Sequence, residues 1–422
     1  MDLDQADISR GELNAVCQQT AVTHSKVGGL IRPLLNATNS LGASSNQEQG
    51  TFMNIKTHSC LSASRRGLKA LGSLIALLML TAGAATGVVP TPKEIRGPFP
   101  IMSTVYFEDG SVDYDGLKRQ LRWVDDSGCP GVIWCQSNDA IDLLTNEEKF
   151  RGFEACAEAA EGRKVVLTLG ASGTNTAKML ELAAEIERVA ERHPGVKMAI
   201  ISRPPDDVRT EADIEQAWNE LAKVAKRPVI FQTYGTPATP TPSVALLVRL
   251  AEKHPAIYGY VKEEAEGYSA VERMSVLSAA KPVIKTAMAG WGGWQWLLQL
   301  RQCGCEGLVT ERCAFAPVLA KLWSIHESGD HGLRLTEAYA MFRLLCDQRN
   351  FPSGLRGYPL YFLEKEGVFR NRVSRQYPNS RVTDGGSFGV GNVWKLEKTE
   401  LTPLQCRELD ALYRDMLEFV AK

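Results

Sequence analysis

Lys262 is the residue whose type and setting best suit covalent chemistry. It follows the apolar run 257–261 and is followed at once by Glu263 and Glu264, so its amine lies where a buried strand would meet a polar strand end. Burial favours the neutral amine of a lysine, and only the neutral amine attacks a carbonyl to form a Schiff base. An ordinary ion pair at a strand end explains the same residues equally well, because structural ion-pair networks also perturb pKa values.

The composition is that of a soluble globular protein. The chain has 422 residues, of which 44% are hydrophobic and 23% charged, and its formal net charge is -1. Such a balance gives no broad electrostatic attraction for nucleic acid or for an anionic membrane surface. The length exceeds that of one ordinary domain, but a single α/β barrel with appendages can fill it. We therefore expect a small-molecule ligand and no nucleic-acid partner.

The first 90 residues differ in character from the rest. Residues 1–52 are rich in Gln, Asn, Ser and Gly without a sustained apolar period, and we expect them to be an unstructured or mis-assigned extension. Residues 53–89 have the layout of an export signal, with a basic stretch, a short apolar run and small residues at the end. Residues 64–69 resemble the twin-arginine signal of bacteria, short by one residue. A disordered or helical tail is the alternative interpretation.

This signal decides the expected location. The apolar run 71–80 is too short for a membrane span, so we expect no stable span in the mature chain. If Met53 is the true start and the signal is genuine, the mature chain begins near Ala85 and the protein is periplasmic or exported. Otherwise we expect a cytoplasmic protein.

The cysteines and histidines do not suggest a metal site. The ten cysteines and six histidines show no metal-ligand spacing. Cys303 and Cys305 form the closest pair, but residues so placed rarely meet the geometry of a disulfide. We expect buried thiols and no bound metal.

From residue 98 onward, short apolar runs alternate with amphipathic helical segments. Helix-forming stretches include 145–161, 174–193, 211–226 and 243–254, and several open with Ser or Thr followed by acidic residues. Strands that alternate with helices predict parallel pairing, and eight such units close into a (β/α)8 TIM barrel with its active site at the carboxyl ends of the strands. An open doubly wound sheet is the alternative, weakened by the absence of a Gly-rich phosphate loop after the first strand. The eight expected strands are 99–106, 131–136, 164–170, 196–201, 228–233, 257–263, 282–288 and 307–312. We therefore assign residues 97–332 to the barrel and 333–422 to a C-terminal helical extension.

Polar residues at the predicted strand ends gather into one candidate site. Because side chains alternate along a strand, Lys262 shares a face with Tyr260 and Glu264, whereas Glu263 points the other way. If that face is the inner one, Lys262 projects into the barrel mouth among neutral donors, as carbonyl chemistry through an iminium requires. The strand ends supply Thr104, Gln136, Ser137, Asn138, Asp139, Gly170, Ser172, Arg203, Gln232, Tyr234, Lys262, Glu264, Trp291, Glu311 and Arg312.

Several segments together resemble one enzyme family. These segments are 100–113, 144–148, 170–176, 260–263, 291–293 and 304–307. Over Gly97 to about Gly367, in the right order, they resemble the dihydrodipicolinate synthase and N-acetylneuraminate lyase family of class I aldolases. The resemblance implies a Schiff base on Lys262 with no other cofactor. It also implies a homo-oligomer, by resemblance a tetramer, with extra helices after Leu335 at a subunit contact.

The chain departs from the family where substrate and protons are handled. The family's Gly-Thr-Thr-Gly-Glu segment, which holds the substrate carboxylate, reads 136-QSNDA-140 here. The family's Tyr-Asn pair after strand five is replaced by Gln232 and Thr233, and an amide cannot take over the proton relay of a phenol. Tyr234 can substitute for that phenol if the strand persists. The Pro-Tyr-Tyr segment expected after strand four is replaced by residues that begin with Arg203.

These observations lead to one main hypothesis for function. We expect a lyase, of carbon-carbon or carbon-oxygen type, in which Lys262 attacks the ketone of pyruvate or of a sugar-derived 2-oxo acid. Ser137 and Asn138 would hold the carboxylate, and Tyr234 or Glu264 would move protons. The remaining candidate substrate-binding residues are Thr104, Gln232, Arg203 and Trp291.

Three alternatives remain open from the sequence. Arg203 can bind an acidic group of the substrate, or it can be a surface arginine paired with Asp206 or Asp207. Trp291 can stack on a sugar ring or belong to the core. Finally, the changed residues also suit a barrel that has lost turnover and serves a binding or interaction role.

Overall fold

The computed structural model describes residues 94–136, 139, 141–234, 239–265, 267–310, 312–348, 351, 357–376 and 395–422. These residues belong to one compact unit, Ala84–Lys422. The expected extension 1–52 and the expected export signal 53–89 lie outside the described residues. No helix within the described ranges is long and apolar enough to cross a membrane.

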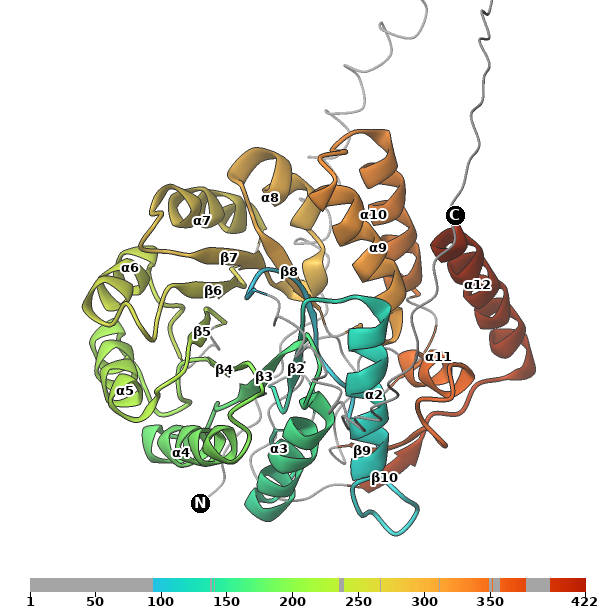
Figure 1. Ribbon diagram of the computed structural model, residues 1–422, viewed down its shortest axis with the longest axis horizontal. Coiled ribbons are helices and arrows are strands. Elements are labelled where there is room, and N and C mark those ends of the chain that lie inside the picture. The colour runs from blue at the N-terminus through green and yellow to red at the C-terminus, as the bar shows by residue number, and fades with distance from the viewer. Residues whose placement is uncertain are drawn as a thin grey trace, which may run out of the picture. The chain divides into compact units, whose positions relative to one another are not determined.

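Eight parallel strands form a barrel at the centre of the molecule (Figure 1). Their order in the sheet is β1-β8-β7-β6-β5-β4-β3-β2. A parallel bridge between Ile101 and Ile133 joins the two ends of that order and closes the ring. The strands are β1 (Gly97–Pro100), β2 (Gly131–Trp134), β3 (Val166–Gly170), β4 (Met198–Ser202), β5 (Val229–Gln232), β6 (Tyr260–Glu263), β7 (Thr286–Ala289) and β8 (Gly307–Thr310). The predicted (β/α)8 TIM barrel is confirmed, and each strand overlaps its predicted segment. The prediction places the first strand too late, because β1 ends at Pro100 and not at residue 106.

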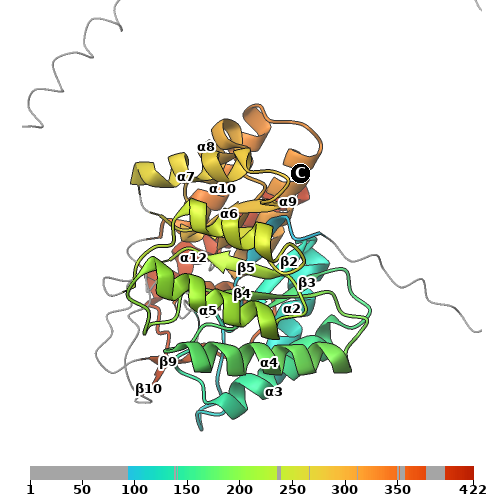
Figure 2. The ribbon, with the colours of Figure 1, turned by 90° about the vertical axis from the view of Figure 1, so that its left-hand side faces the viewer.

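A helix follows each strand and covers the outside of the barrel (Figure 2). The local sequence explains where these helices start. Thr145 and Glu148 form a reciprocal capping box at the start of α3, which satisfies two backbone N–H groups that the first turn leaves free. The helices are α2 (Tyr114–Ser127), α3 (Asn146–Ala160), α4 (Thr176–Arg192), α5 (Glu211–Val224), α6 (Val244–Lys253), α7 (Gly267–Ala279), α8 (Trp296–Cys303) and α9 (Ala316–Glu327).

Two separate apolar clusters show which face of each strand points inward. The smaller cluster fills the barrel and takes alternate strand residues such as Ile201 and Ile230, with Tyr260 packed against it. The larger cluster lies between the strands and the helices and includes Val261. Since side chains alternate along β6, Lys262 points into the barrel, on the same face as Tyr260.

The residue after Lys262 points to the helix layer. Glu263 accepts hydrogen bonds from Nε and Nη2 of Arg273 on α7, at 3.0 and 3.1 Å. The two neighbouring glutamates therefore serve different layers, as the alternation along the strand predicts.

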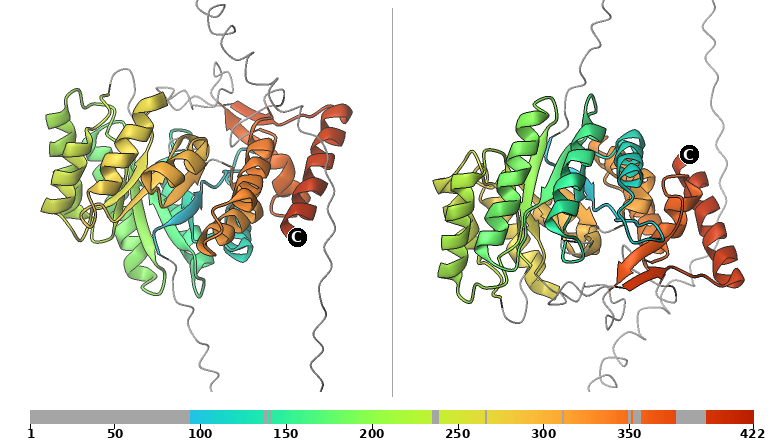
Figure 3. Two further views of the ribbon diagram at one scale, coloured as in Figure 1. Left: turned by 90° about the horizontal axis from the view of Figure 1, so that it is seen from above. Right: turned by 90° about the horizontal axis from the view of Figure 1, so that it is seen from below.

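The C-terminal tail packs on the side of the barrel formed by α9 (Figure 3). The sequence predicted helices here, and the structure adds an antiparallel two-stranded sheet that was not predicted. Arg375 of β9 reaches the barrel and donates to both carboxylate oxygens of Glu148, at 2.6 and 2.8 Å. It also donates to the backbone oxygens of Leu143 and Gly110, at 2.8 and 2.7 Å. The tail elements are α10 (Leu333–Cys346), α11 (Pro359–Lys365), β9 (Val373–Gln376), β10 (Lys395–Lys398) and α12 (Pro403–Ala421).

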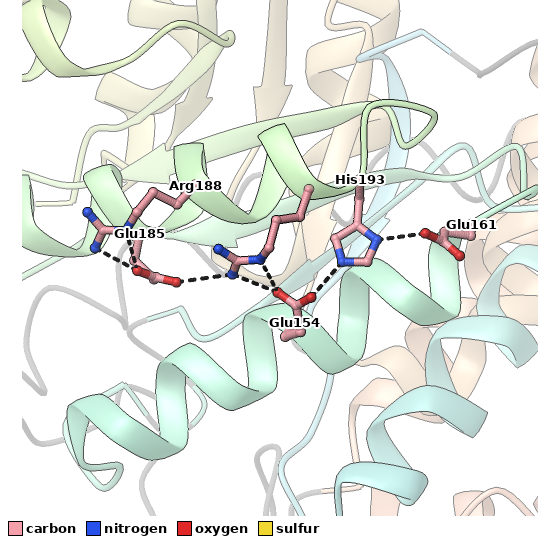
Figure 4. A network of polar contacts seen from close by, with 6 residues as sticks. Glu154, Glu161, Glu185, Arg188 and His193 are labelled. Carbon is pink, nitrogen blue, oxygen red and sulfur yellow. Dashed lines mark hydrogen bonds and ion pairs between the residues drawn. The ribbon is translucent and has the colours of Figure 1, made fainter.

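A network of charged side chains joins α3 to α4 on the outside of the barrel (Figure 4). His193, at the end of α4, lies between Glu161 and Glu154, with its Nδ1 and Nε2 at 2.7 and 2.8 Å from their carboxylates. Arg192 extends the network from Glu154 to Glu185. Burial lowers the pKa of His193, but the hydrogen bonds with the two glutamates outweigh that effect, so the pKa is raised overall.

The raised pKa of His193 predicts a pH-dependent stability. The unfolded chain releases this proton near pH 6.5, so the stabilising effect is complete below about that pH and is lost as the pH rises through the higher folded-state pKa. We expect the contribution of His193 to the free energy of unfolding, measured in urea, to fall as the pH rises above about 6.5. The free energy of unfolding of the His193→Gln variant should fall less over the same range. Equal pH profiles for the two proteins would contradict the assignment.

Candidate active site

Lys262 lies inside the barrel near the carboxyl end of β6, with its side chain 1% exposed. Its Nζ lies 2.8 Å from Oε1 of Glu264, whose side chain is 4% exposed. The sequence suggested neutral donors around the amine, and the structure instead places a carboxylate against it. The ion pair considered from the sequence is therefore present, but it lies within the barrel interior.

Two glutamines extend this pair across the barrel. Nε2 of Gln232, on β5, donates to Oε2 of Glu264 at 2.7 Å. Nε2 of Gln136 donates in turn to Oε1 of Gln232 at 2.6 Å. Lys262, Glu264, Gln232 and Gln136 thus form one hydrogen-bonded chain, called here the interior relay.

Gln136 enters the interior because the backbone turns just before it. Ile133 faces the interior cluster and Trp134 the outer one, so simple alternation would send Gln136 outward. Cys135, however, has φ of 60°, a left-handed conformation that costs a non-glycine residue about 1–2 kcal/mol. Gly170 makes room for this turn, since a Cβ there would lie 1.8 Å from the carbonyl oxygen of Cys135. The sequence analysis placed Gln136 at a strand end but did not predict that its side chain enters the barrel interior. The one signal for it was a glutamine at the position where the family that the chain resembles has glycine.

Trp291 forms a wall beside Glu264. Its indole N–H donates to the backbone oxygen of Glu264. The ring of Tyr234 packs edge-on against Trp291, with centroids 5.6 Å apart. Tyr234 therefore packs on the residue that bonds the backbone of Glu264. It lies in the loop after β5, which ends at Gln232, so the strand does not persist to that residue.

Thr104 belongs to a neighbouring cluster. Its backbone N–H donates to Asp139 at 2.8 Å, and its hydroxyl donates to the other oxygen of the same carboxylate. The hydroxyl also accepts from Nε1 of Trp134 at 3.0 Å. Its single proton is thus directed to Asp139, a residue that sequence reasoning placed at the strand end but gave no role.

Arg203 is buried and ion-paired. Its guanidinium donates to both oxygens of Asp206, at 2.5 and 3.2 Å, which is the pairing considered from the sequence. It is only 1% exposed, so it is not a surface arginine. Burial raises the pKa of nearby Asp142, and the positive charges of Arg203 and Lys149 oppose that rise.

Ser137 and Asn138, the predicted carboxylate-binding residues, lie outside the described residues. Burial raises the pKa of the Cys135 thiol to about 12, so this thiol does not compete with Lys262 as a nucleophile. Cys303 and Cys305 are buried free thiols. Among the described residues, no group of three or more His, Cys, Asp or Glu side chains could hold a metal ion.

Comparison with known proteins gives a consistent result. The chain is 26% identical to a 4-hydroxy-tetrahydrodipicolinate synthase of Rhizobium meliloti over 180 residues, which cover 43% of this chain and 58% of that protein. It is 23% identical over 227 residues to the protein of the same name from Chlorobaculum parvum, which covers 54% of this chain and 73% of the other. The matched region thus spans a little over half of the Rhizobium protein. No family model matches the chain.

Solved structures show the same fold. Dihydrodipicolinate synthase from Rhodopseudomonas palustris superposes with a TM-score of 0.60 at 18% identity, covering 77% of this chain and 99% of that one. The sialic acid aldolase of Ruminococcus gnavus gives a TM-score of 0.59 at 17% identity, covering 77% and 97%. A prophage protein of the dihydrodipicolinic acid synthase family from E. coli K12, solved with pyruvate, gives 0.53 at 19% identity, covering 65% and 85%.

Proposed function

We propose that this chain, a divergent member of the dihydrodipicolinate synthase and N-acetylneuraminate lyase family, is a lyase that forms a Schiff base between Lys262 and the ketone of a 2-oxo acid. One observation carries the proposal. The amine of Lys262 is buried inside the barrel, near the carboxyl end of a strand, and lies 2.8 Å from a carboxylate that can take its proton. Active sites of such barrels lie at this end of the strands.

Glu264 gives the reaction a proton acceptor in direct contact with the nucleophile. The Lys262 ammonium transfers a proton to Glu264, and the neutral amine attacks the ketone carbon to give a carbinolamine. The protonated Glu264 then returns its proton to the departing hydroxyl, which leaves as water. The products are an iminium on Lys262 and the Glu264 carboxylate, so the charge and the protons balance.

The iminium then acts as the electron sink for cleavage, condensation or dehydration at the neighbouring carbon. No other cofactor is needed, because the cationic nitrogen itself accepts the electron pair. Glu264 lies beside this nitrogen and is our choice for the proton transfers, with Tyr234 as the second candidate. Gln232 holds Glu264 in place through the 2.7 Å hydrogen bond.

The remaining candidates would bind the substrate around this centre. Ser137 and Asn138 remain our candidates for holding the carboxylate. Thr104 donates its amide and hydroxyl protons to Asp139, so its proposed contribution is to position that carboxylate. Trp291 offers an aromatic ring, and Arg203 would bind an acidic substrate group in competition with Asp206, to which it is already paired.

Borohydride trapping tests the proposal directly. The protein is incubated with pyruvate and with a panel of sugar-derived 2-oxo acids, reduced with borohydride, and weighed by mass spectrometry. We expect a mass increase equal to one reduced adduct for each chain, located on the peptide that contains Lys262. A protein that gains no mass with any 2-oxo acid would refute the proposed function.

Gly290 provides a sharper test of the geometry around Glu264. A Cβ at Gly290 would lie 2.2 Å from Cγ of Glu264 and 2.6 Å from the backbone oxygen of Glu263. We expect Gly290→Ala to displace the Glu264 carboxylate and to slow imine trapping by about tenfold to a hundredfold, because displacements near 1 Å at a reacting centre have effects of that size. Gly195→Ala is the matched control, since nothing lies within 4 Å of its Cβ. An unchanged trapping rate in Gly290→Ala would exclude a role for the position of Glu264.

A second candidate function is a barrel that binds a 2-oxo acid without turning it over. The observation that favours it is the interior relay, in which an amide replaces the family's phenol. Trapping of the imine with no released product from any aldehyde or sugar acid would support this candidate. We also expect a homo-oligomer, which light scattering of the purified protein would establish.

A further inference from the structure

The interior relay ends in an unused hydrogen-bond acceptor. Gln136 is completely buried, and its Oε1 has no hydrogen-bond partner among the described residues. A buried polar atom without a partner is costly, so such atoms in native proteins call for an explanation. Here the atom lies in the barrel interior, on a side chain linked through Gln232 and Glu264 to Lys262.

The direction of the relay makes this end an acceptor and not a donor. The Glu264 carboxylate can only accept, so Gln232 must turn its NH2 group toward it. The oxygen of Gln232 then faces Gln136, which must present its own NH2 group in turn. Rotating either amide by 180° would bring two acceptors together. Oε1 of Gln136 is therefore the free acceptor at the end of the relay.

We propose that Gln136 is a specificity-determining residue that accepts a hydrogen bond from a hydroxyl group of the substrate. This inference rests on the proposed function, because it assumes that the substrate is attached to Lys262. A carboxylate and a ketone have no proton to donate, so pyruvate alone would leave Oε1 unpaired. A 2-oxo acid with a hydroxyl group beyond its ketone carbon supplies the missing donor.

The backbone conformation just before Gln136 supports a role for this residue in binding. The left-handed conformation of Cys135 turns Gln136 inward against the strand alternation, and Gly170 provides the space for that turn. Such a conformation persists only where the surroundings enforce it, and it concentrates at functional sites. Substrate pockets that hydrogen-bond a hydroxyl discriminate strongly against analogues that lack it, because the polar group is then left unpaired.

Two matched pairs of acids test the inference. Hydroxypyruvate is compared with pyruvate, and 4-hydroxy-2-oxobutanoate with 2-oxobutanoate, by the concentration that half-saturates borohydride trapping. The variant is Gln136→Met, which keeps the length of the side chain and removes the acceptor. Gln299→Met is the control, because Gln299 on α8 is another buried glutamine whose Oε1 lacks a partner among the described residues. The ratio within each pair cancels any general effect on folding or on imine formation.

In the unmodified protein we expect at least one hydroxylated acid to be favoured over its partner by about tenfold, the size of one well-placed hydrogen bond. Gln136→Met should remove that preference and Gln299→Met should keep it. Equal trapping of both acids in each pair, or a preference that survives in Gln136→Met, would overturn the role of Gln136. Absence of trapping with all four acids would instead refute the Schiff-base proposal itself.

Discussion

Lys262→Ala is expected to abolish the borohydride-trapped adduct with every 2-oxo acid and to reduce any lyase turnover by a factor on the order of 10⁴ or more. The reason is that no other group in the relay can form an imine. Glu264 has no amine, and the glutamine amides are not nucleophilic. Mass spectrometry before and after reduction measures the adduct, and a coupled assay measures turnover.

The design must separate loss of chemistry from loss of folding. Removing Lys262 leaves the carboxylate of Glu264 buried without its partner, which typically costs about 3–5 kcal/mol. The double variant Lys262→Met with Glu264→Gln removes both charges and keeps the side-chain volumes, so it should fold and still form no adduct. Lys281→Ala is the matched control, because Lys281 is a half-exposed lysine paired with Glu306. An adduct that persists without Lys262 would place the nucleophile elsewhere.

Glu264→Gln is expected to slow imine formation by roughly 10²- to 10⁴-fold, the range for loss of a general acid or base. Glutamine keeps the shape of the side chain and can still hydrogen-bond to Gln232, but it cannot take the proton of Lys262. The trapping rate is measured by quenched reduction over a range of pH. A rate equal to that of the unmodified protein would transfer the proton role to Tyr234.

The adjacent residue provides the control for this variant. Glu263 lies on the opposite face of β6, where it accepts two hydrogen bonds from Arg273. Glu263→Gln should lower the free energy of unfolding by roughly 1.5–3 kcal/mol, the range for hydrogen bonds to charged groups. The imine should still form in the folded fraction. The two substitutions, one residue apart, thus separate chemistry from stability.

The sequence contained enough information for the barrel and for the face that Lys262 shares with Tyr260, but not for which face points inward. Apolar runs of strand length are determined locally, and the alternation along 257–263 places Tyr260 and Lys262 on one face whatever surrounds them. The start of α3 is also local, because Thr145 and Glu148 satisfy each other three residues apart.

Three other features, namely the position of Gln136, the C-terminal sheet and the contact between Lys262 and Glu264, depend on conformations and contacts that the sequence does not signal. The position of Gln136 depends on one left-handed residue, Cys135, of a type that rarely adopts that conformation. The sheet of β9 and β10 joins two short polar strands, and residues 395–398 have no alternating apolar pattern that would mark a strand. The close contact between Glu264 and Lys262 depends on Gly290, which leaves space that only the folded chain reveals.

The hydrogen bonds of Arg375 join segments that are far apart in the chain and can form only late in synthesis. This arginine holds Glu148, which lies 227 positions earlier, and the backbone oxygen of Leu143 in the loop that follows Gln136. A ribosome must therefore synthesise nearly the whole chain before that loop receives its anchor. A chain cut off before residue 375 would therefore lack the hydrogen bonds that tie Leu143 and Glu148 to the C-terminal tail.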